Sequence, residues 1–341
     1  MKKGTSFTFL FFAIIVVGCS ISSPQKTKDI DVRVGFNGLV PEFSKNTPPV
    51  KMFENDIFPV ILKVRNNGAS DIKKENNQFA YISLGIEKDY TKQLQLKTSD
   101  NVKKVSEASA MFNLDGKTSL NPTGDLEVIS YELKAGNVDP QSEAHSSTVI
   151  ATVCYPYQTI LATTVCIDTD ISNTKPGKKV CTMQDLTFSN GQGAPVAIPK
   201  IEVSMLPAEI SGDNQISTVK PQFLIYIENK DKGNVIKYGY EREYCTNSQI
   251  THENLNKIYV TASLGGTALY CPTNRKEINE ESKDGYVKLV DKKAVARCFL
   301  KEQGSIKRIE DNYLTPLKIT LAYGYTQSLL ANYFIQKATG Q

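Results

Sequence analysis

Two histidines and a few carboxylates are the residues of this chain with the most obvious catalytic chemistry. Nucleophilic catalysis needs a base beside the nucleophile, and histidine is the usual base. His145 lies in a polar segment and His252 precedes a short stretch that could form one helical turn. Neither histidine adjoins a G-x-S-x-G nucleophile elbow. We therefore expect both to be exposed surface residues, and we expect no enzyme activity.

Carboxylates offer a second kind of chemistry. Glu253, Glu280 and Glu281 would suit a glycosidase only at a defined separation, which the sequence does not show. The segment DTDISN (168–173) has oxygen ligands for calcium, but it lacks the central glycine and terminal glutamate of an EF-hand loop. The segment GQGA (191–194) resembles half of a phosphate loop, but a proline follows it directly. We predict no catalytic residue, no metal site and no cofactor.

Six of the seven cysteines lie between positions 154 and 298, and an even number in an exported protein favours disulfides. No C-x-x-C pair is present, so a zinc site is not expected. Fifteen pairings are open to six cysteines. We favour two bridges, Cys166–Cys181, which encloses a turn-rich segment, and Cys271–Cys298, which encloses a long loop. Cys154 and Cys245 are left unassigned.

The seventh cysteine, Cys19, ends an N-terminal segment (1–19) with two lysines and an apolar run of about eleven residues. That run is too short to span a membrane and has the length of a signal-peptide core. Val-Val-Gly-Cys (16–19) resembles a lipobox, the processing site of prokaryotic lipoproteins, which implies acylation of Cys19. Ordinary cleavage, or retention of residues 4–18 as an anchor helix, remains an alternative. The polar stretch 20–29 is expected to be a tether.

Composition excludes one class of partner. The net charge of +4 is small for 341 residues, and charges of both signs are interspersed. A nucleic-acid partner is therefore not expected. The expected partners are the membrane, through an N-terminal lipid, and an unidentified envelope or surface protein or glycan.

Alternating runs rich in Val, Ile, Thr, Tyr and Phe predict an all-β chain. Helical periodicity is scarce, with a turn or two possible at Val105–Phe112 and Thr251–Asn256. The expected strands are Asp31–Phe36, Val60–Arg65, Phe79–Ile86, Leu126–Leu133, Thr148–Tyr155, Ile160–Ile167, Ile201–Met205, Phe223–Glu228, Lys257–Leu264, Val295–Leu300, Leu317–Tyr323 and Leu329–Ile335.

An internal repeat is visible in two pairs of segments. ILKVRNNG (61–68) matches LIYIEN (224–229) followed by KDKG, and ATVCYPY (151–157) matches ITLAYGY (319–325). The two pairs have nearly the same offset, which predicts a tandem duplication. Each Tyr-x-Tyr is expected to be a tight turn before a last strand. The recurring tyrosines are expected to pack in the structure rather than to face a ligand.

Each copy has the length and strand pattern of an antiparallel sandwich. The strand closing on Asn-x-Gly resembles CARDB-like domains, immunoglobulin-like modules of archaeal and bacterial cell-surface proteins. The segment from Gly35 to Pro49 and the CYPYQT segment resemble surface proteins of small-genome archaea. The resemblance implies two tandem immunoglobulin-like sandwiches, although the chain has no tryptophan for an antibody-type core. The expected divisions are a signal segment with lipobox (1–19), a tether (20–29), a first sandwich (30–168), a linker (169–195) and a second sandwich (196–341).

Recognition is expected in two long polar segments, 88–121 and 272–284, because loops on a rigid scaffold often carry binding. Together these features predict a non-catalytic adhesion or scaffold protein on the outer face of the cytoplasmic membrane or in the envelope. A self-assembling filament or layer subunit is the first alternative. An envelope carbohydrate-processing enzyme that uses loop carboxylates is the second.

Overall fold

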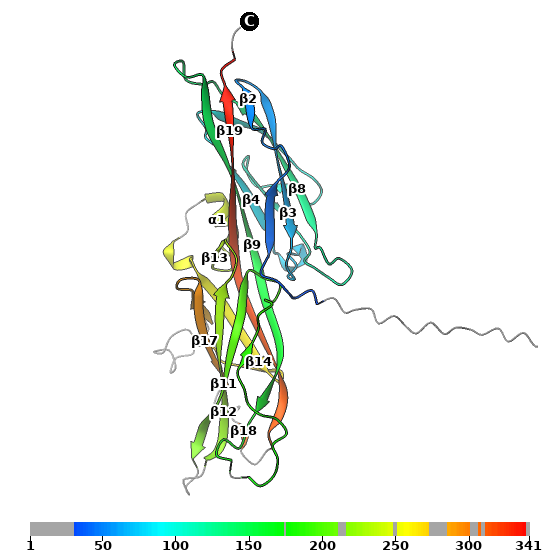
Figure 1. The fold of residues 1–341 in the computed structure, drawn as a ribbon, viewed down its shortest axis with the longest axis vertical. Helices are drawn as coiled ribbons and strands as arrows, with labels where there is room; N and C mark the ends of the chain where they lie inside the picture. Colours follow the sequence, from blue (N-terminus) through cyan, green and yellow to red (C-terminus); the bar gives the residue numbers. More distant parts are fainter. Residues whose placement is uncertain are drawn as a thin grey trace, which may run out of the picture. The chain divides into compact units, whose positions relative to one another are not determined.

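The computed structural model describes residues 31–173, 175–210, 216–247, 251–272, 285–300, 306–307 and 311–338. These residues belong to one compact unit, Asp31–Gln341. The unit is almost entirely β-structure in antiparallel sheets (Figure 1), which confirms the predicted all-β class. The lipobox, the tether and most of the loop 272–284 lie outside the described residues.

The first half of the unit contains nine strands and a 3-10 turn. They are β1 (Leu39–Phe43), β2 (Lys51–Phe53), β3 (Ile57–Asn66), η1 (Lys74–Asn76), β4 (Ala80–Gly85), β5 (Thr91–Lys97), β6 (Lys103–Lys104), β7 (Ser109–Phe112), β8 (Leu126–Ala135) and β9 (Ala144–Ile167).

The second half repeats this order with one helix added. Its elements are β10 (Leu186–Thr187), β11 (Val196–Ile210), β12 (Ile216–Asn229), β13 (Asn234–Ile236), α1 (Glu241–Asn247), η2 (His252–Asn254), β14 (Lys257–Leu264), β15 (Thr267–Ala268), β16 (Tyr286–Lys288), β17 (Lys293–Phe299), β18 (Ile306–Lys307) and β19 (Tyr313–Gln336).

The long strands β9 and β19 connect the two halves. They pair antiparallel over their whole length, from Tyr313 opposite Ile167 to Gln336 opposite Ala144, and Figure 1 shows them running side by side. β4 pairs with the first part of β9, whereas β14 pairs with the first part of β19. One ten-stranded sheet, with the path β15-β14-β19-β9-β4-β7-β6, therefore runs through both halves.

A second sheet packs on each half of this central pair. In the first half the sheet β1-β3-β8-β5 does so, and in the second half the sheet β10-β11-β12-β17. The ring of Phe58 on β3 lies 5.4 Å from that of Tyr333 on β19, and Thr91 Oγ1 lies 2.7 Å from the Tyr333 hydroxyl. Apolar side chains from both layers form a continuous core, because alternate residues of each strand point inward.

The repeated sequence landmarks meet inside this core. Tyr157 donates a hydrogen bond of 2.9 Å to Asn66 Oδ1, and Tyr325 donates one of 3.1 Å to Asn229 Oδ1. Each asparagine also donates through Nδ2 to the carbonyl four residues later, over 2.9 Å. A Cβ on Gly68 would collide with the Tyr157 hydroxyl. The asparagine that ends β3 or β12 therefore anchors the corresponding long strand in the same way.

The sequence predicted that each Tyr-x-Tyr motif forms a tight turn, and this prediction was wrong. Tyr155–Tyr157 and Tyr323–Tyr325 lie within continuous strands, with Pro156 directly opposite Gly324. Pairing of β9 with β4 ends at Cys154, so Pro156 lies where β9 has one neighbouring strand. A proline without an N–H is tolerated at such a position.

Three other expectations about elements were wrong. Residues 31–36 form no strand, although Gly35 bridges to Gly191. Val105–Phe112 is not helical, since β7 covers its end. The segment 88–121 is not one long loop, because it contains β5, β6 and β7. Its strands are short and mostly polar, which hides the alternation that marks a strand.

Candidate functional site

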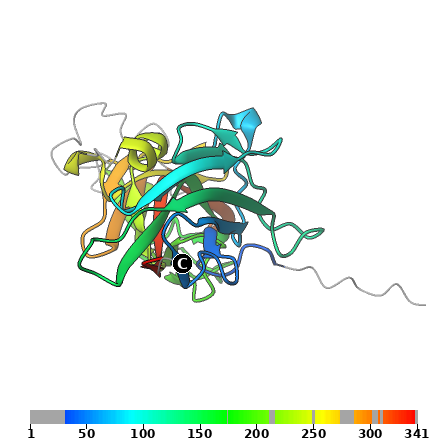
Figure 2. The same cartoon turned by 90° about the horizontal axis from the view of Figure 1, so that it is seen from above.

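Helix α1 is the main addition to the second half. The connection from Asn229 to β14 (230–256) is longer than its counterpart in the first half (67–79), and the extra length carries α1. Figure 2 shows the helix on the outer side of the strands. The two halves therefore differ in this connection.

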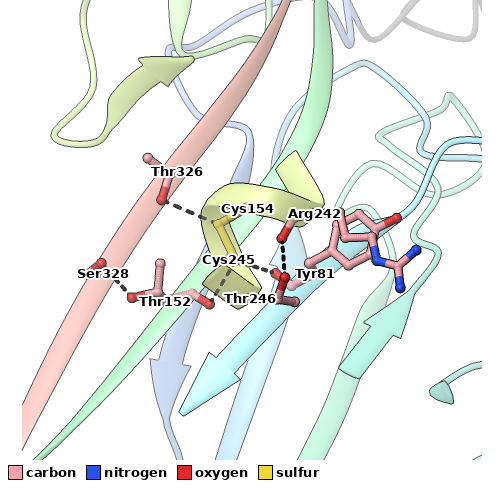
Figure 3. The surroundings of a disulfide bond; sticks show 8 residues. All are labelled: Tyr81, Thr152, Cys154, Arg242, Cys245, Thr246, Thr326 and Ser328. Atoms are coloured by element: carbon pink, nitrogen blue, oxygen red, sulfur yellow. Dashed lines mark hydrogen bonds between the residues drawn. A yellow bond between two sulfur atoms is a disulfide. The ribbon is translucent and has the colours of Figure 1, made fainter. Parts of the chain in front are cut away.

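A disulfide fixes α1 to the first half. Cys245 of the helix bonds to Cys154 of β9, 91 residues earlier, with the two Cα atoms 5.9 Å apart. Figure 3 shows the bridge between the helix and the sheet. Cys245 Sγ lies 3.5 Å from the carbonyl oxygens of Tyr81 and Thr152. Because α1 has only seven residues, this cross-link and the packing beneath it hold the helix in place.

A cavity of about 380 Å³ lies beside α1, where the two halves meet. Residues 76–79 and Tyr81, from the end of η1 into β4, form one side. Tyr238, Gly239 and residues 241–243, at the start of α1, form the other side, and Pro156 also lines the cavity. Gln78 Nε2 donates a 3.1 Å hydrogen bond to the Tyr238 hydroxyl, which joins the two sides. We call this cavity the α1 cleft.

Glu241 is the unusual titratable group of the α1 cleft. The residue is 5% exposed, and its Oε1 accepts a 2.9 Å hydrogen bond from the Gly239 amide. Burial raises the pKa of this carboxyl to about 7, although hydrogen bonds from the backbone amides of Gly239 and Glu241 oppose the rise. The nearby charge of Glu243 raises it further. Glu241 is therefore part protonated near neutral pH.

Gly324 makes room for this carboxyl. A Cβ at Gly324 would lie 2.7 Å from Glu241 Oε1 and 2.6 Å from Ile236 Cγ1. The smallest residue thus stands where the carboxyl packs against β19. The glycine of the second Tyr-x-Tyr motif therefore lies directly against the Glu241 carboxyl.

The charged groups of the α1 cleft do not form an acid–base pair. Glu241 is buried and Glu243 is exposed, and residues two apart on a helix face different directions. Arg242 and Glu243 also line a neighbouring cavity of about 390 Å³, together with Val105, Ser106 and Thr246.

The repeated tyrosines Tyr155, Tyr157, Tyr323 and Tyr325 are fully buried. Rings 155 and 157 are 5.5 Å apart, and rings 155 and 325 are 5.7 Å apart. Burial raises the pKa of all four hydroxyls. The expectation that they pack in the structure is confirmed.

The two histidines are not brought together into a site. His145 stacks on Tyr90, with ring centroids 3.5 Å apart, and its Nε2 lies 3.1 Å from Glu87 Oε2. His252 is exposed in η2. The expectation of an exposed side chain therefore holds for His252, whereas His145 is half-buried.

The acidic turn weighed for calcium binds a lysine instead. Lys179 Nζ lies 2.5 Å from Asp168 Oδ2 and 3.0 Å from the Asp170 carbonyl. The Asp170 amide donates to Asp168 Oδ1 over 2.9 Å. Across the described ranges, no cluster of three or more His, Cys, Asp or Glu side chains could hold a metal ion.

Two further disulfides join Cys166 to Cys181 and Cys271 to Cys298, which are the pairings favoured from the sequence. Cys19 and the carboxylates Glu280 and Glu281 lie outside the described residues. The part of the chain that the structure describes has no helix with the length and apolar character of a membrane span.

Sequence reasoning missed the α1 cleft. Its polar residues are scattered over 76–81 and 238–243, and no local motif marks them. One signal was available, because the second repeat has a longer connection after its Asn landmark and an unassigned cysteine within it.

No protein-family model matches this chain, and no curated protein is similar to it in sequence. Among solved structures, the C-terminal domain of the Streptococcus agalactiae antigen I/II polypeptide BspA is 10% identical, with a TM-score of 0.21, over 88% of this chain and 98% of that one. The S. aureus collagen adhesin is 11% identical, with a TM-score of 0.17, over 90% of this chain and 93% of that one. A Clostridium thermocellum cohesin–dockerin complex is 16% identical, with a TM-score of 0.23, over 31% of this chain and 77% of that one. These TM-scores are too low to carry an argument about function.

Proposed function

We propose that this protein is an exported, lipid-anchored and non-catalytic surface protein that binds an envelope or surface partner at the α1 cleft. Its halves, 30–168 and 196–341, are then immunoglobulin-like sandwiches of the CARDB-like kind, joined by the segment 169–195. The N-terminal lipid on Cys19 and the tether 20–29 would hold them at the outer face of the cytoplasmic membrane or in the envelope.

The observation that carries the binding role is the α1 cleft itself. It lies between two structural halves, where ligand sites are common, and a disulfide and a hydrogen bond hold its walls in place. Fixed walls lower the entropy that a ligand must lose on binding. The three disulfides support export, because such bonds persist in oxidising compartments.

The binding role is tested by filling the α1 cleft. Asn76 is exposed and lines the cleft, so Asn76→Trp would obstruct any ligand whatever its chemistry. Asn190→Trp, at an exposed position outside the cleft, is the matched control. Purified Cys19→Ser protein should bind isolated cell envelopes saturably, and Asn76→Trp should abolish that binding while the control retains it. Equal binding by both variants would exclude the cleft as the recognition site.

Anchoring is tested separately by fractionation of cells whose chains all carry Asn76→Trp, so that binding at the α1 cleft does not itself retain them, and that have Cys19 intact, Cys19→Ser or Ser23→Ala. The chains with Cys19 intact and with Ser23→Ala should sediment with membranes, and the chain with Cys19→Ser should be released. Complete retention of Cys19→Ser would show that an uncleaved N-terminal helix, not a lipid, anchors the chain.

A further inference from the structure

The lining of the α1 cleft restricts the chemistry of its ligand. Three amide side chains stand on one side, from Asn76, Asn77 and Gln78. An amide group carries both donors and acceptors, so it can pair with a group that also does both. A hydroxyl is such a group. The amides therefore favour a ligand with several hydroxyls.

Three aromatic rings share the same cavity, from Phe79, Tyr81 and Tyr238. All three are half-buried, so part of each ring remains accessible to a ligand. Aromatic rings offer flat apolar surfaces that pack well against C–H groups. A ligand that fits both the rings and the amides must have an apolar face and a polar edge.

Other ligand classes fit less well. Within the described lining of the α1 cleft, Pro156 is the one aliphatic side chain, so a purely apolar ligand would leave the amides unpaired. Arg242 is the one cationic side chain there, and Glu241 and Glu243 are acidic, so a phosphate-rich ligand would be poorly neutralised.

We propose that the α1 cleft binds a saccharide, with ring C–H faces packed on Tyr238 and Phe79 and hydroxyls paired with Asn76 and Asn77. This proposal rests on the proposed binding role and names its ligand class. The cavity volume of about 380 Å³ lies in the range of small-molecule sites, about 300–1,000 Å³. The neighbouring cavity of about 390 Å³ shares Arg242 and Glu243, which gives a longer glycan a place to continue.

The test begins with an array of microbial and host saccharides probed with the full-length Cys19→Ser protein. Saccharides that bind are then titrated by calorimetry against four variants. Tyr238→Ala removes a half-buried ring from the α1 cleft, and Tyr226→Ala removes a half-buried ring from β12, outside the cleft. Asn77→Gly removes an amide at a left-handed position (φ 53°), and Asn46→Gly does the same at another exposed left-handed position (φ 60°).

We expect each cleft variant to weaken binding by about tenfold or more, which corresponds to about 1.4 kcal/mol, and each control to leave it unchanged. Circular dichroism melting should be similar for each cleft variant and its control. The proposal is overturned if no saccharide binds at millimolar concentration, if cleft variants bind like their controls, or if the bound saccharide is hydrolysed.

The outcomes separate this proposal from the proposed binding role. If Asn76→Trp abolishes envelope binding but no saccharide binds the protein, the cleft recognises another class of partner and the saccharide assignment fails alone. If Asn76→Trp leaves envelope binding intact, the binding role of the cleft fails as well.

Discussion

The buried hydroxyls of Tyr155 and Tyr157 differ in their hydrogen bonding. The Tyr157 hydroxyl bonds to Asn66, whereas that of Tyr155 has no hydrogen-bond partner among the described residues. Tyr157→Phe should therefore lower the free energy of unfolding by about 1–2 kcal/mol. Tyr155→Phe should leave the free energy of unfolding unchanged or raise it, because the substitution removes a buried hydroxyl that has no hydrogen-bond partner. Urea unfolding measures both values, and equal losses would contradict the assigned contacts.

Glu241 should make stability depend on pH. Its pKa is about 7 in the folded state and 4.5 in its ordinary state, so the folded state holds the proton more tightly. Stability is therefore greatest below the lower value, falls as pH rises between the two, and stays low above the higher one. The difference between the two pKa values corresponds to a loss of about 3 kcal/mol in the free energy of unfolding across this pH range.

Glu241→Gln removes this contribution and keeps the shape of the side chain. We expect the free energy of unfolding of the wild type, minus that of the variant, to fall by up to about 3 kcal/mol between about pH 4 and about pH 8. Urea unfolding across that range gives the difference at each pH. A difference that does not change with pH would show that the carboxyl is not buried.

At the scale of elements, α1 depends on a bond that links distant parts of the chain. Replacing Cys154 and Cys245 by serine should free the helix and lower stability by at most about 5 kcal/mol, since the bridge joins residues 91 positions apart. Hydrogen exchange of peptides covering Glu241–Asn247 should become faster. The matched double variant at Cys166 and Cys181 should leave exchange in α1 unchanged, and faster exchange in both variants would contradict this role.

Some strands could be predicted from the sequence, and others could not. β3, β4, β8 and β14 lie where alternation predicts them, because one face of each strand is buried in the core. The continuity of β9 and β19 could not be predicted, since Pro156 and Gly324 are turn formers locally. The pairing of β9 with β19 overrides this local preference. It places Pro156 opposite Gly324, which is 168 positions later in the chain.

The candidate site was less predictable than the fold. The repeat landmarks correctly pointed to packing of the tyrosines, because recurrence in both copies favours a shared structural role. The α1 cleft instead depends on α1, which only the second half contains. The disulfide between Cys154 and Cys245 holds this helix against the first half. A helix of seven residues, EREYCTN, is too short for a periodic signal. Its position follows from tertiary contacts.

For the whole molecule, the shared strands determine how it unfolds. β9 and β19 pair over their full length and contribute to the sheets of both halves. A fragment of residues 31–195 lacks β19, so β9 would lose its long partner and β2 its pairing with Phe334–Gln336. We expect this fragment alone to be largely unfolded, and the intact chain to show one calorimetric transition.

A core substitution in one half tests that cooperativity. Ile225 is fully buried on β12 in the second half, so Ile225→Ala should cost about 2–5 kcal/mol. If the halves unfold together, hydrogen exchange should then accelerate in β3 and β8 of the first half as much as in β12. The exposed substitution Val295→Ala, on neighbouring β17, should have little effect in either half. Two separate transitions, or faster exchange confined to the second half, would show that each sandwich folds independently despite the shared strands.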